Sequence, residues 1–503
     1  MEILSLGHAC YLLEMETSQG GEPLRILADP WLSDYLVGDL LGRFPRVRVE
    51  PDSLPRLDAV YISHSHTDHL DPYALVSLWP HLQPRPKLLL PQSLRYLEDL
   101  FCRYLDNPEI VFLADREPIS LAGATVMGFF NPEIRPTNED DVMVLSVRTS
   151  REAFLCESDA LLPFYDPEAR ALLSKLLGGE GLETSCLLSI KNEGGATMAM
   201  LGCDPGERPA RLSRELETSY DEIYEIYSEL AEAEDDLWSD PCLVRLIGGQ
   251  GICYPQALET EWNRLLFPIR LADRVNMERD VAGQNELAHS IEEFVPGQMH
   301  SVVGGVLAGR ASCAYLDVLD SERERHFDPQ LALVDGFPCA PLAGGARDLT
   351  EQSRRIGEVL EQRFLPHLIG SRAPPIEHLL AGTRGEYRIR VCFGDTSARH
   401  GERDWVLRFG AFRFVEESVE GEADEHYWAN DLEDFLDGRC DEFSTFCRKP
   451  LGGREQRLWR TLGLPYLNND LIERKIALHF ARAAAGEDLE NWVLSFHRTP
   501  LSQ

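Results

Sequence analysis

The chain has 503 residues, a length that suggests about two to four domains. Hydrophobic residues make up 44% and charged residues 26%, so the chain can bury a sizeable core and wholesale disorder is excluded. Asp and Glu number 84 against 49 for Lys and Arg, which gives a formal net charge of -35. Because such a chain repels phosphate backbones and anionic lipid surfaces, we expect neither a nucleic acid nor a membrane among its partners.

The apolar segments and the cysteines indicate a compartment. No run of about 18 apolar residues is present, so no transmembrane helix is expected. The first eight residues lack the basic and apolar stretches of a signal peptide and are typical of a first strand. The 12 cysteines stand without any CxxC pair, and Cys156 and Cys186 lie in apolar runs, as buried thiols do. We therefore expect a cytoplasmic protein.

Strand and helix signals alternate over the first 160 residues. Short alternating or apolar runs bounded by turn residues indicate strands, and a helix is expected over residues 71–80. This alternation predicts an α/β architecture. The expected strands cover residues 2–6, 10–16, 24–28, 58–62, 87–90, 110–113, 125–129, 142–147 and 153–156.

The pattern changes towards the C-terminus. Residues 209–238 are helical and acidic, which we interpret as a solvated insertion, and residues 243–252 are expected to form one more core strand. We expect a domain boundary near residue 310, which gives a first domain over 1–310 and a C-terminal α+β domain over 311–503. The second domain would hold helices at 349–369, 431–436 and 469–485, and an antiparallel meander at 387–393, 404–408 and 410–415.

One short segment carries the chemistry. After the strand expected at 58–62 the chain runs Ser63-His64-Ser65-His66-Thr67-Asp68-His69. Imidazole nitrogens and carboxylate oxygens are good ligands for zinc, iron and manganese, and this spacing can face two neighbouring metal positions from one tight loop. The alternative is a polar loop that happens to be rich in histidine, and the rarity of histidine counts against it.

The segment is the H-x-H-x-D-H signature of the metallo-β-lactamase superfamily, which the chain also resembles at residues 7–10 (Gly-His-Ala-Cys) and 29–32 (Asp-Pro-Trp-Leu). The resemblance implies an αββα sandwich with metals at one edge of two packed sheets, so that the 1–310 domain binds metal. It also implies the ligands: His64 and His66 for a first metal, and Asp68 and His69 for a second.

A bridging carboxylate would follow a later strand in this superfamily. Asp159, after the strand expected at 153–156, fits that place, and Glu157 competes with it. A carboxylate that ends a strand can also be only a turn or N-cap residue. We expect Asp159 to be the ligand, with a part in catalysis alongside Asp68.

The chain departs from the usual hydrolase pattern in its third motif. Between residues 82 and 156 there is no histidine, and the acidic run 138–141 stands in that region. Glu139 or Asp141 could supply the ligand, with Glu133 as a further candidate, and oxygen ligands shift the preference from zinc towards iron or manganese. The alternative is that this acidic run is a solvated turn.

The last histidine ligand of the superfamily also has no counterpart. Residues 246–252, within the strand expected at 243–252, contain no histidine. His289 and His300 come later, and His300 could reach the site. A lone histidine near a turn is more often structural. The sequence therefore predicts one tightly held metal and one weakly held metal.

Within the superfamily the chain resembles the CMP-N-acetylneuraminate hydroxylase type. The resemblance covers most of the chain and rests on residues 29–32, 59–64 and 136–141, with weaker C-terminal matches at 432–438, 443–449 and 464–471. Those hydroxylases use a Rieske iron–sulfur domain, which needs Cys-x-His and Cys-x-x-His ligand pairs that this sequence lacks. An oxygenase here would need electrons from a separate donor protein or from its substrate.

Three hypotheses follow. The favoured one is a non-haem iron oxygenase with one or two iron ions that acts on a small-molecule substrate. The alternative is a zinc hydrolase of an ester, amide or phosphoester, in which the metal lowers the pKa of bound water to about 7 and Asp68 orients it. The third is a degenerate fold that serves as a binding scaffold. The expected metal ligands are His64, His66, Asp68, His69, Asp159 and Glu139 or Asp141.

Overall fold

The computed structural model divides into two compact units: Met1–Leu36, Gly42–Glu133 and Asp140–Val334 form unit 1, and Val37–Leu41, Ile134–Glu139 and Asp335–Gln503 form unit 2. The structure describes residues 1–17, 21–36, 42–43, 46–130, 142–160, 167–179, 181–190, 240–249, 252–253, 271–287, 289–318, 347–365, 386–394, 399–408, 410–411, 413–417, 421, 423, 425–436 and 469–489, with seven positions between 217 and 228.

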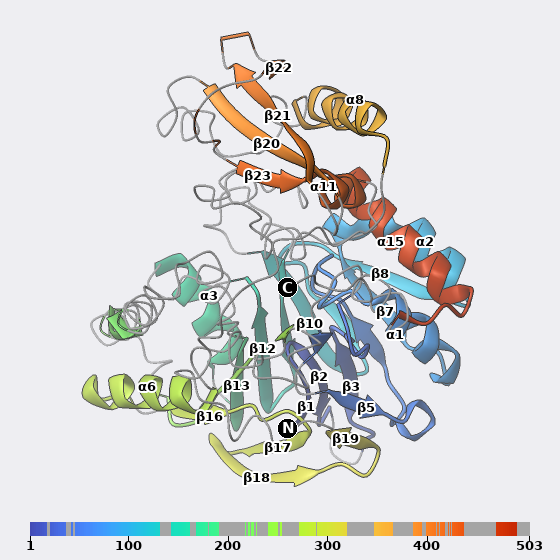
Figure 1. Cartoon of the computed structure of the whole chain (residues 1–503). Coiled ribbons are helices and arrows are strands. Elements are labelled where there is room, and N and C mark those ends of the chain that lie inside the picture. The colour runs from blue at the N-terminus through green and yellow to red at the C-terminus, as the bar shows by residue number, and fades with distance from the viewer. Residues whose placement is uncertain are drawn as a thin grey trace. The chain divides into compact units, whose positions relative to one another are not determined.

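An eight-stranded sheet forms the first layer of unit 1 (Figure 1). The first five strands in sheet order are antiparallel to their neighbours, and the other three continue in parallel from the fifth. In sheet order the strands are β18 (Val306–Ser312), β17 (Gln298–Val303), β1 (Glu2–Gly7), β2 (Cys10–Met15), β3 (Leu24–Ala28), β6 (Ala59–Tyr61), β7 (Lys87–Pro91) and β8 (Glu109–Leu113).

A seven-stranded sheet forms the second layer. Its first four strands in sheet order are parallel, and its last three are antiparallel to their neighbours. In sheet order they are β16 (Ser290–Glu293), β14 (Leu243–Gly248), β13 (Thr184–Ile190), β12 (Glu152–Ser158), β11 (Met143–Arg148), β10 (Ala124–Phe130) and β9 (Ile119–Leu121).

Apolar side chains from both sheets form one shared core. The Tyr11 ring of β2 and the Phe154 ring of β12 meet there with their centres 5.5 Å apart. A second cluster joins the other face of the seven-stranded sheet to two helices, through residues such as Leu173 and Val275. Figure 1 shows these two helices beside the seven-stranded sheet and two others beside β7 and β8. The helices are α3 (Pro167–Leu177) and α6 (Leu271–Gln284), then α1 (Pro72–Leu78) and α2 (Glu98–Tyr104).

Two small sheets tie loops of unit 1 together. Each joins a segment that follows β3 to a segment more than 200 positions later in the chain. They pair β4 (Gly42–Arg43) with β15 (Ile252–Cys253), and β5 (Val47–Val49) with β19 (Leu316–Val318).

Unit 2 is built around a four-stranded sheet. Three strands form the expected antiparallel meander, and a fourth pairs with the first in parallel. The helix expected over 349–369 begins after the N-cap Asp348 and changes at Leu360 into a π-helix over Leu360–Phe364. The elements are α8 (Leu349–Val359), β20 (Glu386–Gly394), β21 (Arg399–Arg408), β22 (Arg413–Glu417), β23 (Glu425–Trp428), α11 (Ala429–Leu436) and α15 (Asn469–Ala484).

The expected fold class is confirmed. Unit 1 is an α/β sandwich with two sheets face to face and helices outside them, and the C-terminal part combines helices with a sheet. Most of the acidic segment 209–238 lies outside the described residues. Of the described helices, none is long and apolar enough to cross a bilayer.

Candidate metal centre

The histidine-rich loop leaves β6 at the edge where parallel strands end. The first two residues of the loop still bond to neighbouring strands. Ile62 donates its N–H to the carbonyl of Leu89 on β7, and Met143 on β11 donates its N–H to the carbonyl of Ser63, each at 3.1 Å. The chain then turns sharply, with His69 and the residue after it both donating to the carbonyl of His66. This turn brings the motif side chains back over the strand end.

Asp71 closes the loop and starts α1. One carboxylate oxygen accepts from the N–H groups of Tyr73 and Ala74, at 2.9 and 3.0 Å, which caps the helix. The other oxygen accepts from the N–H of Ser33 at 3.0 Å, which ties the loop to the segment after β3. Pro72 stands at the first helical position, where a backbone N–H would have no acceptor within the helix. Proline lacks this N–H and therefore suits the start of α1.

Asp29, directly after β3, supports the histidine-rich loop through hydrogen bonds to Ser63 and His69. Its two oxygens accept from the N–H and the hydroxyl of Ser63, each at 2.7 Å. One of them also lies 2.8 Å from Nδ1 of His69. This contact fixes the ring with Nε2 pointing away from Asp29. Carboxylates orient metal-binding histidines in the same way. Ser63 passes the support on, because its hydroxyl lies 2.9 Å from Nδ1 of His64.

A first group of possible metal ligands joins the motif to the end of β12. Nε2 of His69 lies 3.2 Å from an oxygen of Asp159, and Nε2 of His64 lies 4.0 Å from the same oxygen. The two imidazole rings are 4.0 Å apart between centres. One ligand atom from each of these three residues lies within 4.8 Å of the others, so together they could hold a metal ion.

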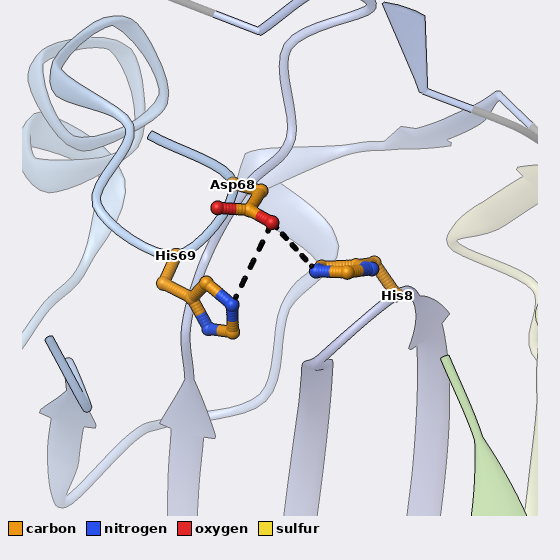
Figure 2. Close-up of side chains that lie close together, drawn as sticks. All are labelled: His8, Asp68 and His69. Carbon is orange, nitrogen blue, oxygen red and sulfur yellow. Dashed lines mark ion pairs between the residues drawn. The ribbon is translucent and has the colours of Figure 1, made fainter. Parts of the chain in front are cut away.

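A second group, shown in Figure 2, joins the motif to the turn between β1 and β2. An oxygen of Asp68 lies 3.0 Å from Nε2 of His8 and 3.7 Å from Nε2 of His69. All three side chains are buried and point toward one another. His69 therefore belongs to both groups, with Asp159 on one side and Asp68 on the other.

The charges around the motif set opposite pKa directions for its histidines. Burial, together with the neighbouring His69 and His66, holds the pKa of His64 well below its ordinary value. Burial also opposes protonation of His69, but the carboxylates Asp159, Asp68 and Asp29 outweigh it and raise the pKa of that ring. His64 is thus a neutral imidazole, which is the form that binds a metal.

The neighbouring histidines lower the pKa values of the carboxylates in the two groups. Burial alone would raise the pKa of Asp159, and the His69 ring lowers it below its ordinary value. The pKa of Asp68 is likewise held well below its ordinary value, because His69 and His8 outweigh its burial. Both carboxylates therefore stay ionised at neutral pH, as ligands of a cation must be.

Three residues around the site have left-handed backbone although they are not glycine. They are His8 (φ 49°), Asp29 (φ 43°) and Ser158 (φ 48°), each at or just after the end of a strand. This region is costly for residues with a Cβ, and such strain gathers where a site demands it. The three positions follow or end β1, β3 and β12, and the Ser158 hydroxyl lies 3.2 Å from that of Ser63.

The remaining expected ligands fall elsewhere. His66 packs against His64, with ring centres 4.2 Å apart, and belongs to neither group of described ligands. Glu139, Asp141 and Glu133 lie outside the described residues. The roles predicted for these four residues stay predictions.

The two alternatives that the sequence left open have other environments. Glu157 is buried on β12 and, by strand alternation, shares its side with Leu155 of the helix-facing cluster. His300 on β17 engages the main chain with both ring nitrogens, since Nε2 accepts from the N–H of Val295 and Nδ1 lies 3.3 Å from the carbonyl oxygen of Ile3.

Sequence reasoning missed three residues of the site as functional groups. His8, Asp29 and Ser63 were noticed only within matching segments, not as a possible ligand and two supports. A signal was present, because a histidine after one strand and an aspartate after another precede a third strand that ends in histidines. What the sequence lacked was the order of these strands in the sheet, which places their ends together.

Residues 24–152 match the family model described as a beta-lactamase superfamily domain. The match covers about a quarter of the chain, nearly all of it within unit 1. The matched stretch holds Asp29 and the whole histidine motif, whereas His8 and Asp159 lie just outside it. The superfamily assignment made from the sequence is thereby confirmed, and the narrower resemblance to the sialic acid hydroxylase type stays a prediction.

The chain also resembles individual proteins. It is 35% identical over 72 residues to a protein of Mycolicibacterium smegmatis called a putative Rieske 2Fe-2S iron-sulfur protein, a match over 14% of this chain and only 13% of that protein. CmlA, a diiron beta-hydroxylase from Streptomyces venezuelae, is 18% identical with a TM-score of 0.34, over 58% of this chain and 52% of its own. The metallo-beta-lactamase fold protein YhfI from Bacillus subtilis is 12% identical with a TM-score of 0.31, over 60% and 99%.

Proposed function

We propose that this chain is a metal-dependent enzyme and, more narrowly, a non-haem iron oxygenase that acts on a small molecule. The observation that carries the proposal is the composition of the two ligand groups. The first group has two imidazoles and one carboxylate, from His64, His69 and Asp159, while the second has His8 and Asp68 and shares His69, whose Nε2 can bind only one ion at a time. Two histidines and one carboxylate on one face are the usual ligand set of iron(II) oxygenases.

The residues fit a metal ion. Nε2 of His64 is buried, and no described residue gives it a hydrogen bond. A buried polar atom without a partner is costly, so its retention at the centre of the site favours a ligand there. His69 and Asp159 would complete a first set, while His8 and Asp68 would hold a second ion more weakly, since their own contact must open to admit it.

Iron bound by these residues would supply the redox chemistry of oxygen activation. The chain itself orients the ligands: Asp29 holds Nδ1 of His69, and the Ser63 hydroxyl holds Nδ1 of His64. Burial of the loop keeps bulk water away from the reacting groups, which strengthens every electrostatic contact there. Nε2 of His8 and an oxygen of Asp68 lie 3.0 Å apart, close enough for both to bind the second ion.

Oxygen reduction needs electrons that this sequence gives no centre to deliver. The 503 residues contain no Cys-x-His and Cys-x-x-His pair of the kind that binds a Rieske cluster. Reduction of O2 to water takes four electrons, and hydroxylation draws two of them from the substrate. We therefore include in the proposal a separate electron-donor protein that supplies the other two, or a substrate that supplies all four.

A zinc hydrolase is the second candidate, because two histidines and one carboxylate also form zinc sites of metallopeptidases. In that case the metal would generate hydroxide at neutral pH, and Asp68 would orient it. The absence of iron-dependent turnover would favour this reading.

Metal content and metal dependence separate the two. We would purify the protein without oxygen, measure iron and zinc per chain, strip both with a chelator, and restore either one alone. The oxygenase predicts that iron(II) restores oxygen uptake with a reductant present, and that zinc does not. Full zinc occupancy, with zinc alone restoring cleavage of esters or phosphoesters, would contradict it. His64→Ala should abolish either activity, and His81→Ala, at an exposed histidine, should abolish neither.

A further inference from the structure

Arg43 is a fully buried arginine near the candidate metal centre. Its side chain has no solvent exposure. β4 places it through the antiparallel pairing of Arg43 with Ile252 on β15, and its own N–H donates to the carbonyl of Asp34 at 2.8 Å. The backbone that carries the guanidinium is therefore fixed from two sides.

The guanidinium lies against the turn that carries His8. Its Nη2 is 3.3 Å from the point that a Cβ on Gly7 would occupy, so a glycine at this turn allows the close approach. The carbon of the guanidinium is 5.9 Å from the centre of the Trp31 ring, and the same ring is 5.6 Å from the His8 ring. Arg43 thus shares two neighbours with a residue that contacts Asp68.

The charge of Arg43 has no hydrogen-bond acceptor among the described residues. None of its three side-chain nitrogens, Nε, Nη1 and Nη2, is bonded there. A guanidinium offers five N–H donors, and burying a charge without satisfying them is among the costlier arrangements in a protein. Such a cost is usually retained where a charged ligand repays it.

The nearby acidic and thiol groups give the guanidinium of Arg43 no hydrogen bond. Asp71 uses both oxygens on N–H groups, of Ser33 and of the first turn of α1. Cys10 keeps its proton, because burial raises its pKa to about 12. Asp34 acts on Arg43 only through its charge, without a hydrogen bond. Among the residues that the structure describes, no anion therefore contacts the guanidinium.

We propose that Arg43 binds an anionic group of the substrate, a carboxylate or a phosphate, and so holds that substrate beside the metal ligands. The planar fork of a guanidinium matches either anion with two parallel hydrogen bonds, and burial strengthens the pair. The inference rests on the proposed function for the reaction at this centre. It goes further by assigning the substrate class: a small molecule that carries an oxyanion.

Anion binding to chelator-treated protein tests the inference, because no metal then competes for the anion. The probes are inorganic phosphate and succinate, titrated calorimetrically at constant ionic strength. The variants are Arg43→Met, which removes the charge, and Arg43→Lys, which keeps the charge and loses the fork. Arg56→Met is the matched control, because Arg56 is half exposed and pairs with Glu22 at the surface.

We expect saturable binding of at least one probe to the natural chain, and about 10- to 100-fold weaker binding to Arg43→Met, the loss expected for charge-assisted hydrogen bonds. Arg43→Lys should lie between them, and Arg56→Met should match the natural chain. The melting temperature of Arg43→Met without anion should equal or exceed that of the natural chain, since an unpaired buried charge is gone. The probe that binds tells phosphate from carboxylate.

Equal binding by the natural chain and Arg43→Met, or no binding of either probe, would overturn the inference. So would a large fall in the melting temperature of Arg43→Met without anion, which would make Arg43 structural. If Arg43→Met does not fold, the affinity of Arg43→Lys decides. A chain that binds anion through Arg43 but neither iron nor zinc would sink the proposed function alone, and one that binds iron but no anion would sink this inference alone.

Discussion

At the scale of single residues, the site depends on side chains that stand behind the ligands. Among the described residues, the Asp29 carboxylate has four contacts, two from Ser63 and one each from His69 and Ser158. A carboxylate in this place fixes which nitrogen of His69 carries the proton and raises the basicity of the other. Asp29 is thus a positioning residue, and its effect should show in metal affinity rather than in the fold.

We predict that Asp29→Asn lowers the affinity of the protein for its first metal ion by about 10- to 100-fold, the usual loss when such a support is changed. The amide keeps the shape and can still accept from Ser63, but it loses the charge that faces His69. Dialysis against a buffered metal series gives the affinity. Asp52→Asn, at an exposed aspartate, is the control, and equal affinities for both variants would rule out the positioning role.

His8 offers a second prediction at this scale. Because it contacts Asp68 and not Asp159, His8→Ala should weaken only the ion held by Asp68. Asp159→Ala should weaken the ion held with His64 and leave the other group intact. Metal titrations of the two variants should therefore lose different binding steps. Loss of the same step in both would mean that the chain holds one ion.

At the scale of elements, the sequence predicted some of the fully buried strands, such as β12 and β14, and missed others. Residues 24–28 were expected as a strand with the bounds that β3 has, since turn residues stand on both sides. β13 (Thr184–Ile190) was missed, because the apolar run around Cys186 was interpreted only as the setting of a buried thiol, and a short apolar run alone does not distinguish a strand from a buried helix. β16, β17 and β18 were missed as well.

Some residues of the candidate site could be predicted from the sequence and others could not. His64, Asp68 and His69 were predictable because they are neighbours in the sequence and follow one strand. His8 was not predictable as a ligand, because its approach depends on β1 lying two strands from β3 in the sheet. Arg43 was not predictable either, since the pairing of β4 with β15 joins segments more than 200 positions apart.

His300 on β17 contacts the main chain of Ile3 on β1, and its burial makes the stability of this part of the sheet sensitive to acid. Its ring is buried and neutral, and burial lowers its pKa from 6.5 to about 4. Since the unfolded chain takes up the proton first, stability is retained above pH 6.5 and lost as the pH falls from 6.5 towards 4. The shift corresponds to about 3 kcal/mol.

We therefore predict that His300→Gln reduces the loss of unfolding free energy between pH 6.5 and pH 4 by up to about 3 kcal/mol. Urea melts at a series of pH values measure this. His81→Gln, at a histidine whose side chain is 40% exposed, should keep the pH dependence of the natural chain. The same slope in His300→Gln would assign the acid sensitivity to other groups.

At the scale of the whole molecule, the chain has separate cores. The cluster shared by the two large sheets belongs to unit 1 and lies next to the metal ligands, whereas the cluster around Trp405 and Tyr387 belongs to unit 2. A ligand that binds only the folded state stabilises the part that binds it, by about 2.7 kcal/mol at one hundred times its dissociation constant. Metal should therefore act on one core and not on the other.

We predict two thermal transitions that respond to different changes. Adding metal to chelator-treated protein should raise the midpoint of one transition only, because His64, His69 and Asp159 all lie in unit 1. Trp405→Ala should lower the other, since removing a buried aromatic ring from a core costs about 3–5 kcal/mol. Calorimetry of the natural chain and of Trp405→Ala, each with and without metal, gives four curves. If metal and Trp405→Ala move one and the same transition, the two cores unfold as a single cooperative structure and the separation argued from them is wrong.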